Sequence, residues 1–271
     1  MPGPGTVRYG GNTTCLEIRN GSDIIILDAG TGARALGKAL LAEFGHRPLQ
    51  LNLLISHTHW DHIQGFPFFA PVYEPRCRLT IMGCANSRPS LEAAFAGQME
   101  TTYFPVEFEK LASQIDIQEL PERDFAIGST LVRAHRANHP GLCAGFRLQT
   151  PAGTICFFPD TEPNAGGDDR PMLDFIRAAD VLILDSQYDH AEFKKRAGWG
   201  HGCVDKSVAL ALEAGVKKLI LFHHDPDHDD KKIDLLLRHA KQLVIKKKGA
   251  LRVEAAREGR VIRLSGKKRV K

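Results

Sequence analysis

The chain has 271 residues, of which 43% are hydrophobic and 25% are charged, a composition that permits a sizeable core in an ordinary globular protein. No apolar run approaches the roughly 20 residues that a membrane-spanning helix needs, and the start lacks the basic and apolar segments of a secretory signal. These features and the modest net charge of +4 favour a cytoplasmic protein that does not enter a membrane.

Short apolar runs bounded by turn residues predict the elements of the first half of the chain. In order, these are paired strands at 13–18 and 23–28, a helix at 34–44, strands at 51–55 and 78–82, a helix at 88–97 and a strand at 114–119.

The second half of the chain shows the same alternation of strands and helices. We predict strands at 129–135, 143–149 and 154–158, a helix at 171–178, a strand at 179–184, a helix at 204–214, a strand at 218–222, a helix at 230–243 and a closing strand at 260–264. Because strands dominate each half, with helices between and after them, the pattern is typical of an α+β fold in which two sheets pack face to face with helices outside.

The run Ser-His-Thr-His-Trp-Asp-His at 56–62 is the most informative segment of the sequence. It follows the predicted strand at 51–55, and open α/β sheets keep their sites beyond the carboxyl ends of their strands. Imidazole nitrogens and a carboxylate oxygen are ligands that a zinc-like ion prefers. On a turn, His57 and His59 can converge on one ion, while Asp61 and His62 point to a second.

Further polar residues end strands or follow glycine turns in the same manner, namely His139, Asp160, His201 and His223. A site for two ions needs about this inventory. We expect His139 to complete the first ion's ligands, His223 to complete the second ion's, and the Asp160 carboxylate to bridge both. Each of these residues alone is a weak signal, and their common position at strand ends is what makes the set persuasive.

The run at 57–62 resembles the His-x-His-x-Asp-His signature of the metallo-β-lactamase fold superfamily. The likeness extends from Gly-Gly-Asn-Thr-Thr at 10–14 through Asp28-Ala-Gly almost to the end of the chain. It implies an αββα sandwich with two mixed sheets and two divalent ions, Zn²⁺ or Mn²⁺ with iron as an alternative. It also supports His139, Asp160 and His223 as ligands. We choose His223 over its neighbour His224 because it directly follows the strand at 218–222.

Within that superfamily the chain resembles the phosphodiesterase branch, which includes RNase Z and the phosphoribosyl cyclic phosphodiesterases. His201, in Gly200-His-Gly-Cys-Val, matches the histidine of the His-Ser-Thr motif of RNase Z, which implies a catalytic role. Gly202 and Cys203 depart from that motif. The tRNA-gripping arm of RNase Z would lie between His139 and Asp160, where the sequence leaves room only for a hairpin.

The resemblance therefore predicts a metal-dependent phosphodiesterase that cleaves a small or cyclic phosphodiester with hydroxide held between two ions. Asp61 would orient the hydroxide and accept its proton. His201 would stabilise charge on the phosphate or protonate the leaving group. Asn12, Thr13 and His224 are candidates for contacting the substrate. The alternatives are a thioester or lactone hydrolase of the same fold and an RNA-processing nuclease without the arm. A homodimer is compatible with the family.

The positive charge is concentrated at the end of the chain. Residues 241–271 contain 12 Lys or Arg and 2 Glu, a local charge of +10, so the remainder carries −6. Such a segment can bind nucleic acid, but it is more often simply solvated. We predict one hydrolase domain over residues 1–265 with a basic tail at 266–271, and a non-catalytic nucleic-acid-binding protein is the alternative outside the enzyme class.

Overall fold

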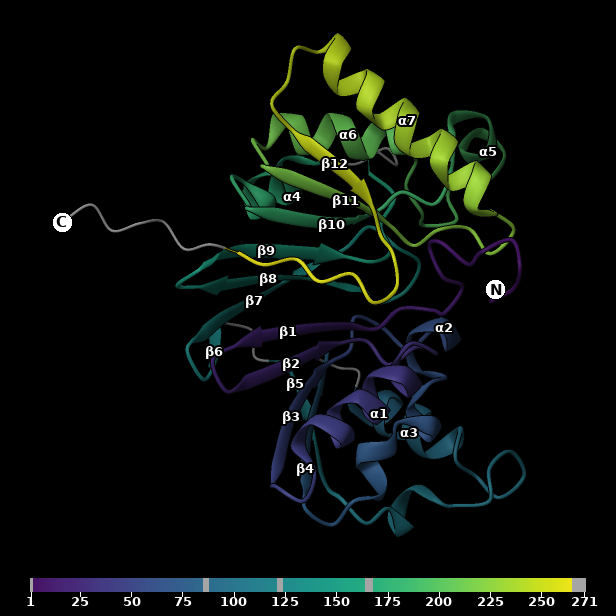
Figure 1. The fold of residues 1–271 in the computed structure, drawn as a ribbon, viewed down its shortest axis with the longest axis vertical. Helices are drawn as coiled ribbons and strands as arrows, with labels where there is room; N and C mark the ends of the chain where they lie inside the picture. The colour runs from purple at the N-terminus through teal and green to yellow at the C-terminus, as the bar shows by residue number, and fades with distance from the viewer. Residues whose placement is uncertain (1, 85–87, 121–123, 164–167, 265–271) are drawn as a thin grey trace, which may run out of the picture. The chain divides into compact units, whose positions relative to one another are not determined.

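The computed structural model describes residues 2–84, 88–120, 124–163 and 168–264, and the chain is traced in Figure 1. It forms two compact units. We call residues 12–129 the N-terminal unit, and residues 1–11 together with 130–271 the C-terminal unit. The predicted basic tail at 266–271 lies outside the described residues.

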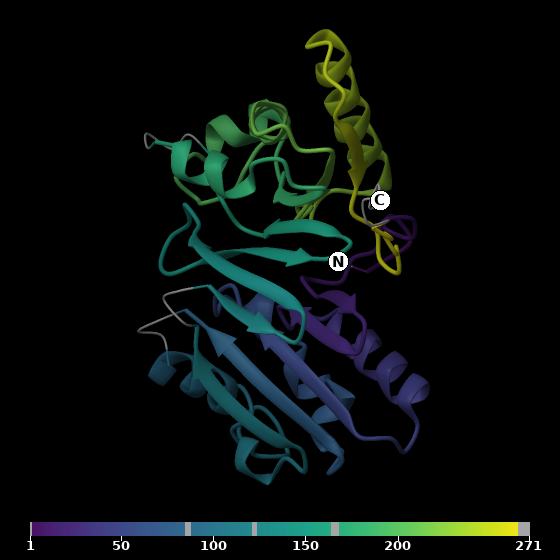
Figure 2. The same ribbon diagram turned by 90° about the vertical axis from the view of Figure 1, so that its left-hand side faces the viewer.

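The N-terminal unit contains a five-stranded mixed sheet in the order β1-β2-β3-β4-β5. The strands are β1 (Leu16–Asn20), β2 (Asp23–Leu27), β3 (Leu49–Leu54), β4 (Cys77–Gly83) and β5 (Gln114–Glu119). The predicted hairpin is confirmed, because β1 and β2 pair antiparallel with Asn20 opposite Asp23. The pairs from β2 to β5 are parallel, and Figure 2 shows β3, β4 and β5 side by side.

Helices and turns of this unit follow the strands. They are α1 (Ala33–Phe44), α2 (Trp60–Ile63), α3 (Arg88–Gly97) and the 3₁₀ turns η1 (Phe66–Phe68), η2 (Ala70–Tyr73) and η3 (Phe108–Lys110). A short strand, β6 (Phe125–Ile127), also belongs to this unit. The core unites Leu40 of α1, Leu51 and Leu53 of β3, and the fully buried rings of Phe66 and Phe95. Burial of this apolar surface fixes which face of β3 points inward, and so where the chain emerges after Leu54.

The C-terminal unit contributes to a second mixed sheet, and the strands of this unit lie in the order β12-β11-β10-β9-β8-β7. They are β7 (Thr130–Arg136), β8 (Ala144–Thr150), β9 (Gly153–Phe158), β10 (Val181–Asp185), β11 (Lys218–Phe222) and β12 (Arg252–Ala255). Strands β7, β8 and β9 pair antiparallel, and β9 to β12 pair parallel. The hairpin β8–β9 fills the interval between His139 and Asp160, as the sequence predicts.

The described residues of this unit also form the helices α4 (Arg170–Ile176), α5 (His190–Lys195), α6 (Val204–Glu213) and α7 (Asp230–Lys246). Figure 1 shows α6 and α7 running beside strands β10 to β12. Val208 of α6 and Leu236 and Ala240 of α7 belong to one buried cluster with Leu184 and Leu221 of the sheet. The apolar faces of these helices therefore cover the parallel strands, which have near-continuous hydrophobic sequences for that reason.

The predicted α+β class with two mixed sheets and accompanying helices is confirmed. The predicted closing strand at 260–264 is wrong, because the last strand is β12 and those five residues form no strand. The local pattern at Val261 and Ile262 favoured a strand there. The strand forms instead at β12, because β12 pairs with β11 and buries Val253, which is only 6% exposed. None of the described helices combines the length and the apolar character needed to cross a membrane.

Candidate metal centre

Strand β3 delivers the histidine run in the N-terminal unit. The chain leaves the sheet after Leu54, and Ser56 and His57 lie buried in the connection before α2. Helix α2 spans only Trp60–Ile63, so Asp61 and His62 occupy its single turn. His62 is fully buried, whereas 37% of the Asp61 side chain is exposed. The run therefore combines buried and exposed side chains within seven residues.

Asp28, which directly follows β2, anchors this run. Its carboxylate accepts hydrogen bonds from the Ser56 amide at 2.7 Å and the Ser56 hydroxyl at 2.8 Å, and it lies 2.8 Å from Nδ1 of His62. Complete burial raises the pKa of Asp28, and the neighbouring His62 opposes that shift. The contact fixes the orientation of the His62 ring and leaves Nε2 as its ligand atom, which is how metal-binding histidines are commonly held.

Backbone hydrogen bonds join the loop after β2 to the segment that contains α2. The Ala29 amide donates to the His62 carbonyl at 2.7 Å, and the Gly65 amide donates to the Ala29 carbonyl at 2.9 Å. A side chain at Gly65 would begin 1.8 Å from the Gly30 carbonyl oxygen, so only glycine permits this approach. The glycines after β2 and α2 therefore position His62 against Asp28.

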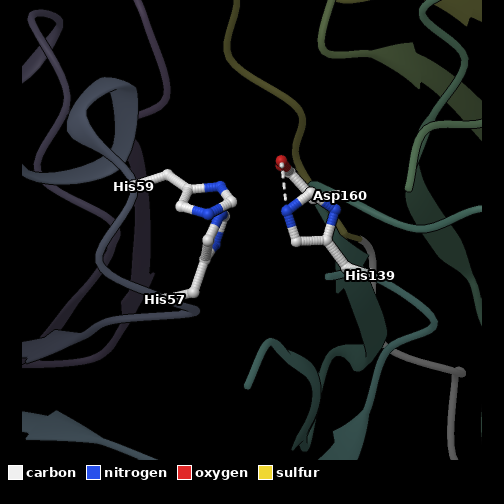
Figure 3. A group of neighbouring side chains, drawn as sticks. All are labelled: His57, His59, His139 and Asp160. Atoms are coloured by element: carbon white, nitrogen blue, oxygen red, sulfur yellow. Dashed lines mark ion pairs between the residues drawn. The ribbon is translucent and has the colours of Figure 1, made fainter. Parts of the chain in front are cut away.

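The remaining side chains of the run lie beside His62. The ring centroids of His57 and His59 are 4.4 Å apart, and those of His57 and His62 are 4.2 Å apart. Nδ1 of His57 lies 3.1 Å from the Ser56 hydroxyl oxygen. Nε2 of His62 lies 3.1 Å from Oδ2 of Asp61, a separation at which both atoms can bind one ion. Figure 3 draws His57 and His59 on this connection.

His139 and Asp160 form the corresponding pair in the C-terminal unit, drawn with a dashed line in Figure 3. Nε2 of His139 lies 3.8 Å from Oδ2 of Asp160, and both side chains are 2% exposed. Nδ1 of His139 lies 3.0 Å from the Gly200 carbonyl oxygen, to which it can donate. Gly200 has φ +87°, and a Cβ there would lie 2.4 Å from His139 Nδ1, so the position requires glycine.

Asp160 also lies close to two further histidines of its own unit, His201 and His223. Asp160, His201 and His223 each offer a ligand atom, and these atoms lie within 4.8 Å of one another. Nε2 of His223 lies 3.4 Å from Oδ1 of Asp160, and the His201 and His223 rings stack with centroids 5.0 Å apart. His223 follows β11 with φ +59°, a left-handed conformation that is uncommon outside glycine and asparagine. Such strain is frequent at functional sites.

Two partners orient these histidines. Nδ1 of His201 lies 2.9 Å from Oδ2 of the fully buried Asp185, at the end of β10. Nδ1 of His223 lies 3.3 Å from Oε1 of Gln187. Burial raises the pKa of Asp185, and the hydrogen bond from His201 opposes this. In each case the contact at Nδ1 leaves Nε2 as the atom that can meet an ion or a substrate.

The three candidates for substrate contact have other neighbours. Nε2 of His224 lies 3.2 Å from the Ala256 carbonyl oxygen, and burial lowers the pKa of His224 to about 4. The hydroxyl of Thr13 accepts from the Thr31 amide at 2.8 Å, within a turn of the N-terminal unit. Asn12 is exposed at the start of that unit. Their roles toward a substrate stay predictions.

The donor set of each unit suits a divalent cation. It consists of imidazole nitrogens and carboxylate oxygens, without cysteine, and the second ring nitrogen of His62, His139 and His223 lies near an oxygen of Asp28, Gly200 or Gln187. Sequence reasoning missed Asp28, Asp185 and Gln187 as orienting groups. Their signal was available, because each lies at or just beyond the end of an apolar strand, as the candidate ligands do.

The chain is similar in sequence to a known family and to curated relatives. A family model described as "Beta-lactamase superfamily domain" matches residues 24–224. Ribonuclease BN of Escherichia coli O6:K15:H31 is 26% identical, in an alignment that covers 70% of this chain and 76% of that protein.

Solved structures share the fold. The metallo-β-lactamase fold protein YhfI from Bacillus subtilis has a TM-score of 0.68 at 20% identity, covering 94% of this chain and 96% of that one. The short form of human tRNase Z has a TM-score of 0.64 at 18% identity, covering 97% and 96%. A diphosphatase from the PhnP family has a TM-score of 0.60 at 14% identity, covering 94% and 86%. The chain therefore belongs to the metallo-β-lactamase fold superfamily and is a hydrolase of that superfamily.

Proposed function

We propose that the protein is a metal-dependent phosphodiesterase that acts on a small or cyclic phosphodiester. In this proposal His57, His59 and His139 hold one divalent ion, Asp61, His62 and His223 hold the second, and Asp160 bridges them. Membership of the superfamily supports the ligand set, as do the buried contacts that fix the rings of His62, His139 and His223. Zinc, manganese and iron all suit these ligands.

Bound ions would supply charge neutralisation at the phosphate and a lowered pKa for water. The chain's own residues would handle the protons. Asp61, with 37% of its side chain exposed, would accept the proton of the attacking water. His201, with 17% exposed, would donate a proton from Nε2 to the leaving oxygen.

The observation that carries the proposal is the contact between His201 and Asp185. A buried carboxylate 2.9 Å from Nδ1 fixes the ring and leaves Nε2 as the atom that can reach a leaving oxygen. The leaving group of an unactivated phosphodiester is an alkoxide, which needs a proton donor near neutral pH. A thiolate leaves without one, so an oriented acid favours a phosphodiester over a thioester.

A processing ribonuclease is the second candidate, favoured by the similarity to Ribonuclease BN. The hairpin of β8 and β9 weighs against it. It occupies the interval between His139 and Asp160 where RNase Z carries its tRNA-gripping arm, so a tRNA would need another means of attachment.

The experiment is hydrolysis of bis(p-nitrophenyl) phosphate by metal-analysed protein, with zinc or manganese added. Asp61→Ala should abolish turnover. His201→Ala should keep much of it, because p-nitrophenolate leaves without a proton. With an unactivated diester, adenosine 2′,3′-cyclic phosphate, His201→Ala should lower turnover by roughly 10²–10⁴-fold while the bound metal stays unchanged. Asp205→Ala serves as a control, because Asp205 pairs with His239 at 3.1 Å on an exposed helix face. Absent turnover with two metals bound per chain would refute the proposal and move the assignment to thioester or lactone hydrolysis.

A further inference from the structure

A pocket of about 790 Å³ lies in the C-terminal unit, beside residues of the candidate centre. Its lining includes Trp199, two residues before His201, and Asp225, two residues after His223. The volume suits a nucleotide-sized ligand. The residues of its wall are distinct from the candidate metal ligands and from His201.

A side-chain bridge links this pocket to a candidate metal ligand. Gln187 lies with Oε1 3.3 Å from Nδ1 of His223, and its Nε2 donates to Oδ2 of Asp225 at 3.3 Å. Asp225 is 8% exposed and forms part of the pocket wall. A molecule in the pocket is therefore linked to His223 through two side chains, Asp225 and Gln187.

The loop that carries Trp199 is held firmly. The carboxylate of Glu162, itself 3% exposed, accepts hydrogen bonds from the amide of Gly198 at 2.8 Å and that of Gly200 at 3.0 Å. Glu162 follows Asp160 by two residues, so the same segment positions a candidate ligand and this loop. Between the two glycines the Trp199 ring is 61% exposed. A rigidly presented aromatic face can stack on a nucleobase with little loss of conformational freedom.

The charged side chains of the wall differ in whether they already form ion pairs. Oε1 of Glu192 lies 3.0 Å from Nε2 of His228 and 3.1 Å from Nζ of Lys232. The side chain of Asp229 caps the N-terminus of α7. Within the ranges that the structure describes, Lys195 and Arg196 form no ion pair. Lysine and arginine side chains in this state can bind a phosphate group.

Two further groups can meet a ribose. Asp227 is exposed at the pocket, and a carboxylate there can accept hydrogen bonds from sugar hydroxyls. His228 is 7% exposed, and its Nδ1 has no hydrogen-bond partner among the described residues although it is buried. A buried ring nitrogen of this kind is costly unless a ligand or water completes it.

We propose that this pocket binds a ribonucleotide unit of the substrate, with the base on Trp199, the ribose near Asp227 and His228, and a phosphate near Lys195 and Arg196. The inference rests on the proposed function and narrows it to phosphodiesters that carry a nucleoside. It assigns substrate selection to residues 195–199 and 225–228, apart from the candidate metal ligands.

The test is calorimetric titration of the full-length, metal-analysed protein with AMP and with ribose 5-phosphate. We expect AMP to bind at least about 10-fold more tightly, since stacking of one base contributes roughly 1–3 kcal/mol. Trp199→Ala should remove that difference and leave ribose 5-phosphate binding within about twofold. Lys195→Gln should weaken both ligands. Tyr103→Ala, an aromatic side chain 72% exposed in the other unit, and Lys241→Gln on α7 are matched controls.

Equal affinities for the two ligands, no binding of either, or a Trp199→Ala variant that keeps the preference would each overturn this assignment. Failure of the proposed function gives a different pattern. If AMP binds as expected but no phosphodiester is hydrolysed, the pocket assignment stands and the phosphodiesterase activity is wrong. If bis(p-nitrophenyl) phosphate is hydrolysed with dependence on Asp61 but the AMP preference is absent, only the pocket assignment is wrong.

Discussion

Oδ2 of Asp185 lies 2.9 Å from Nδ1 of His201, at the end of a buried parallel strand. The same carboxylate accepts from the amides of Thr161 at 3.1 Å and Gln187 at 3.0 Å. Two backbone amides fix the carboxylate, and the carboxylate in turn fixes the imidazole. Asp185 is thus a positioning residue for His201.

Asp185→Asn should lower kcat by roughly 10–100-fold, as loss of a carboxylate that orients a histidine commonly does. The side chain keeps its volume and one acceptor, so the fold and the bound metal should be retained. Turnover, metal content and circular dichroism would be measured together. Asp205→Asn, which alters an exposed Asp–His pair, should change none of them. Wild-type turnover in Asp185→Asn would contradict the positioning role.

Asp28→Asn should weaken metal binding by roughly 10–100-fold, because the His62 ring would lose the carboxylate that orients it. Competition with a chelator, followed by metal analysis, measures this directly. Asp116→Asn on the exposed face of β5 is a control from the same unit. An unchanged metal affinity in Asp28→Asn would show that packing alone orients His62.

Asp160→Ala should abolish binding of at least one ion, whereas His201→Ala should retain the metal. The difference follows from burial, because Asp160 is 2% exposed and lies within 4 Å of three histidines of its unit, at 3.8, 3.9 and 3.4 Å. Metal analysis after gel filtration distinguishes the two variants. Equal metal content in both would count against Asp160 as a ligand.

Glu162→Ala should loosen the loop at 196–200 by leaving the amides of Gly198 and Gly200 without their acceptor. Each buried group left unsatisfied costs about 1–3 kcal/mol. Trypsin cleavage after Lys194, Lys195 or Arg196 should therefore accelerate. Glu213→Ala on α6 is the matched exposed control. A cleavage rate equal to that of the wild type would mean that other contacts hold the loop.

Tyr9→Phe should lower the free energy of unfolding near neutral pH, because the Tyr9 hydroxyl donates to Asp234 at 2.7 Å. That hydrogen bond, with Arg8 nearby, lowers the pKa of Asp234 below its ordinary 3.8. A lowered pKa stabilises the fold above the unfolded-state value, and the contribution disappears as pH falls through the folded-state value.

The gap between wild type and Tyr9→Phe should therefore be constant above about pH 4 and shrink below it. Urea unfolding at several pH values measures the gap. A difference that stays the same at acidic pH would show that Tyr9 acts through packing and not through Asp234.

Most elements, in their order along the chain, were predictable from local pattern. Strands at 114–119 and 218–222 and the helix at 88–97 have the predicted bounds, because apolar runs with clear turn boundaries specify their own structure. The strand at 252–255 was missed. Only pairing with β11 and burial of Val253 make that segment a strand, and neither is visible in a local window.

By itself the sequence determined the kinds of residue available for metal binding and the strand ends that carry them, since spacing and apolar periodicity are local properties. The tertiary structure decided which groups surround each candidate. It brought Asp185 to His201 and Gln187 to His223, and it placed His224 against Ala256. These pairings join residues 16 to 36 positions apart. Such contacts depend on how parallel strands pack and align, which no single stretch of sequence specifies.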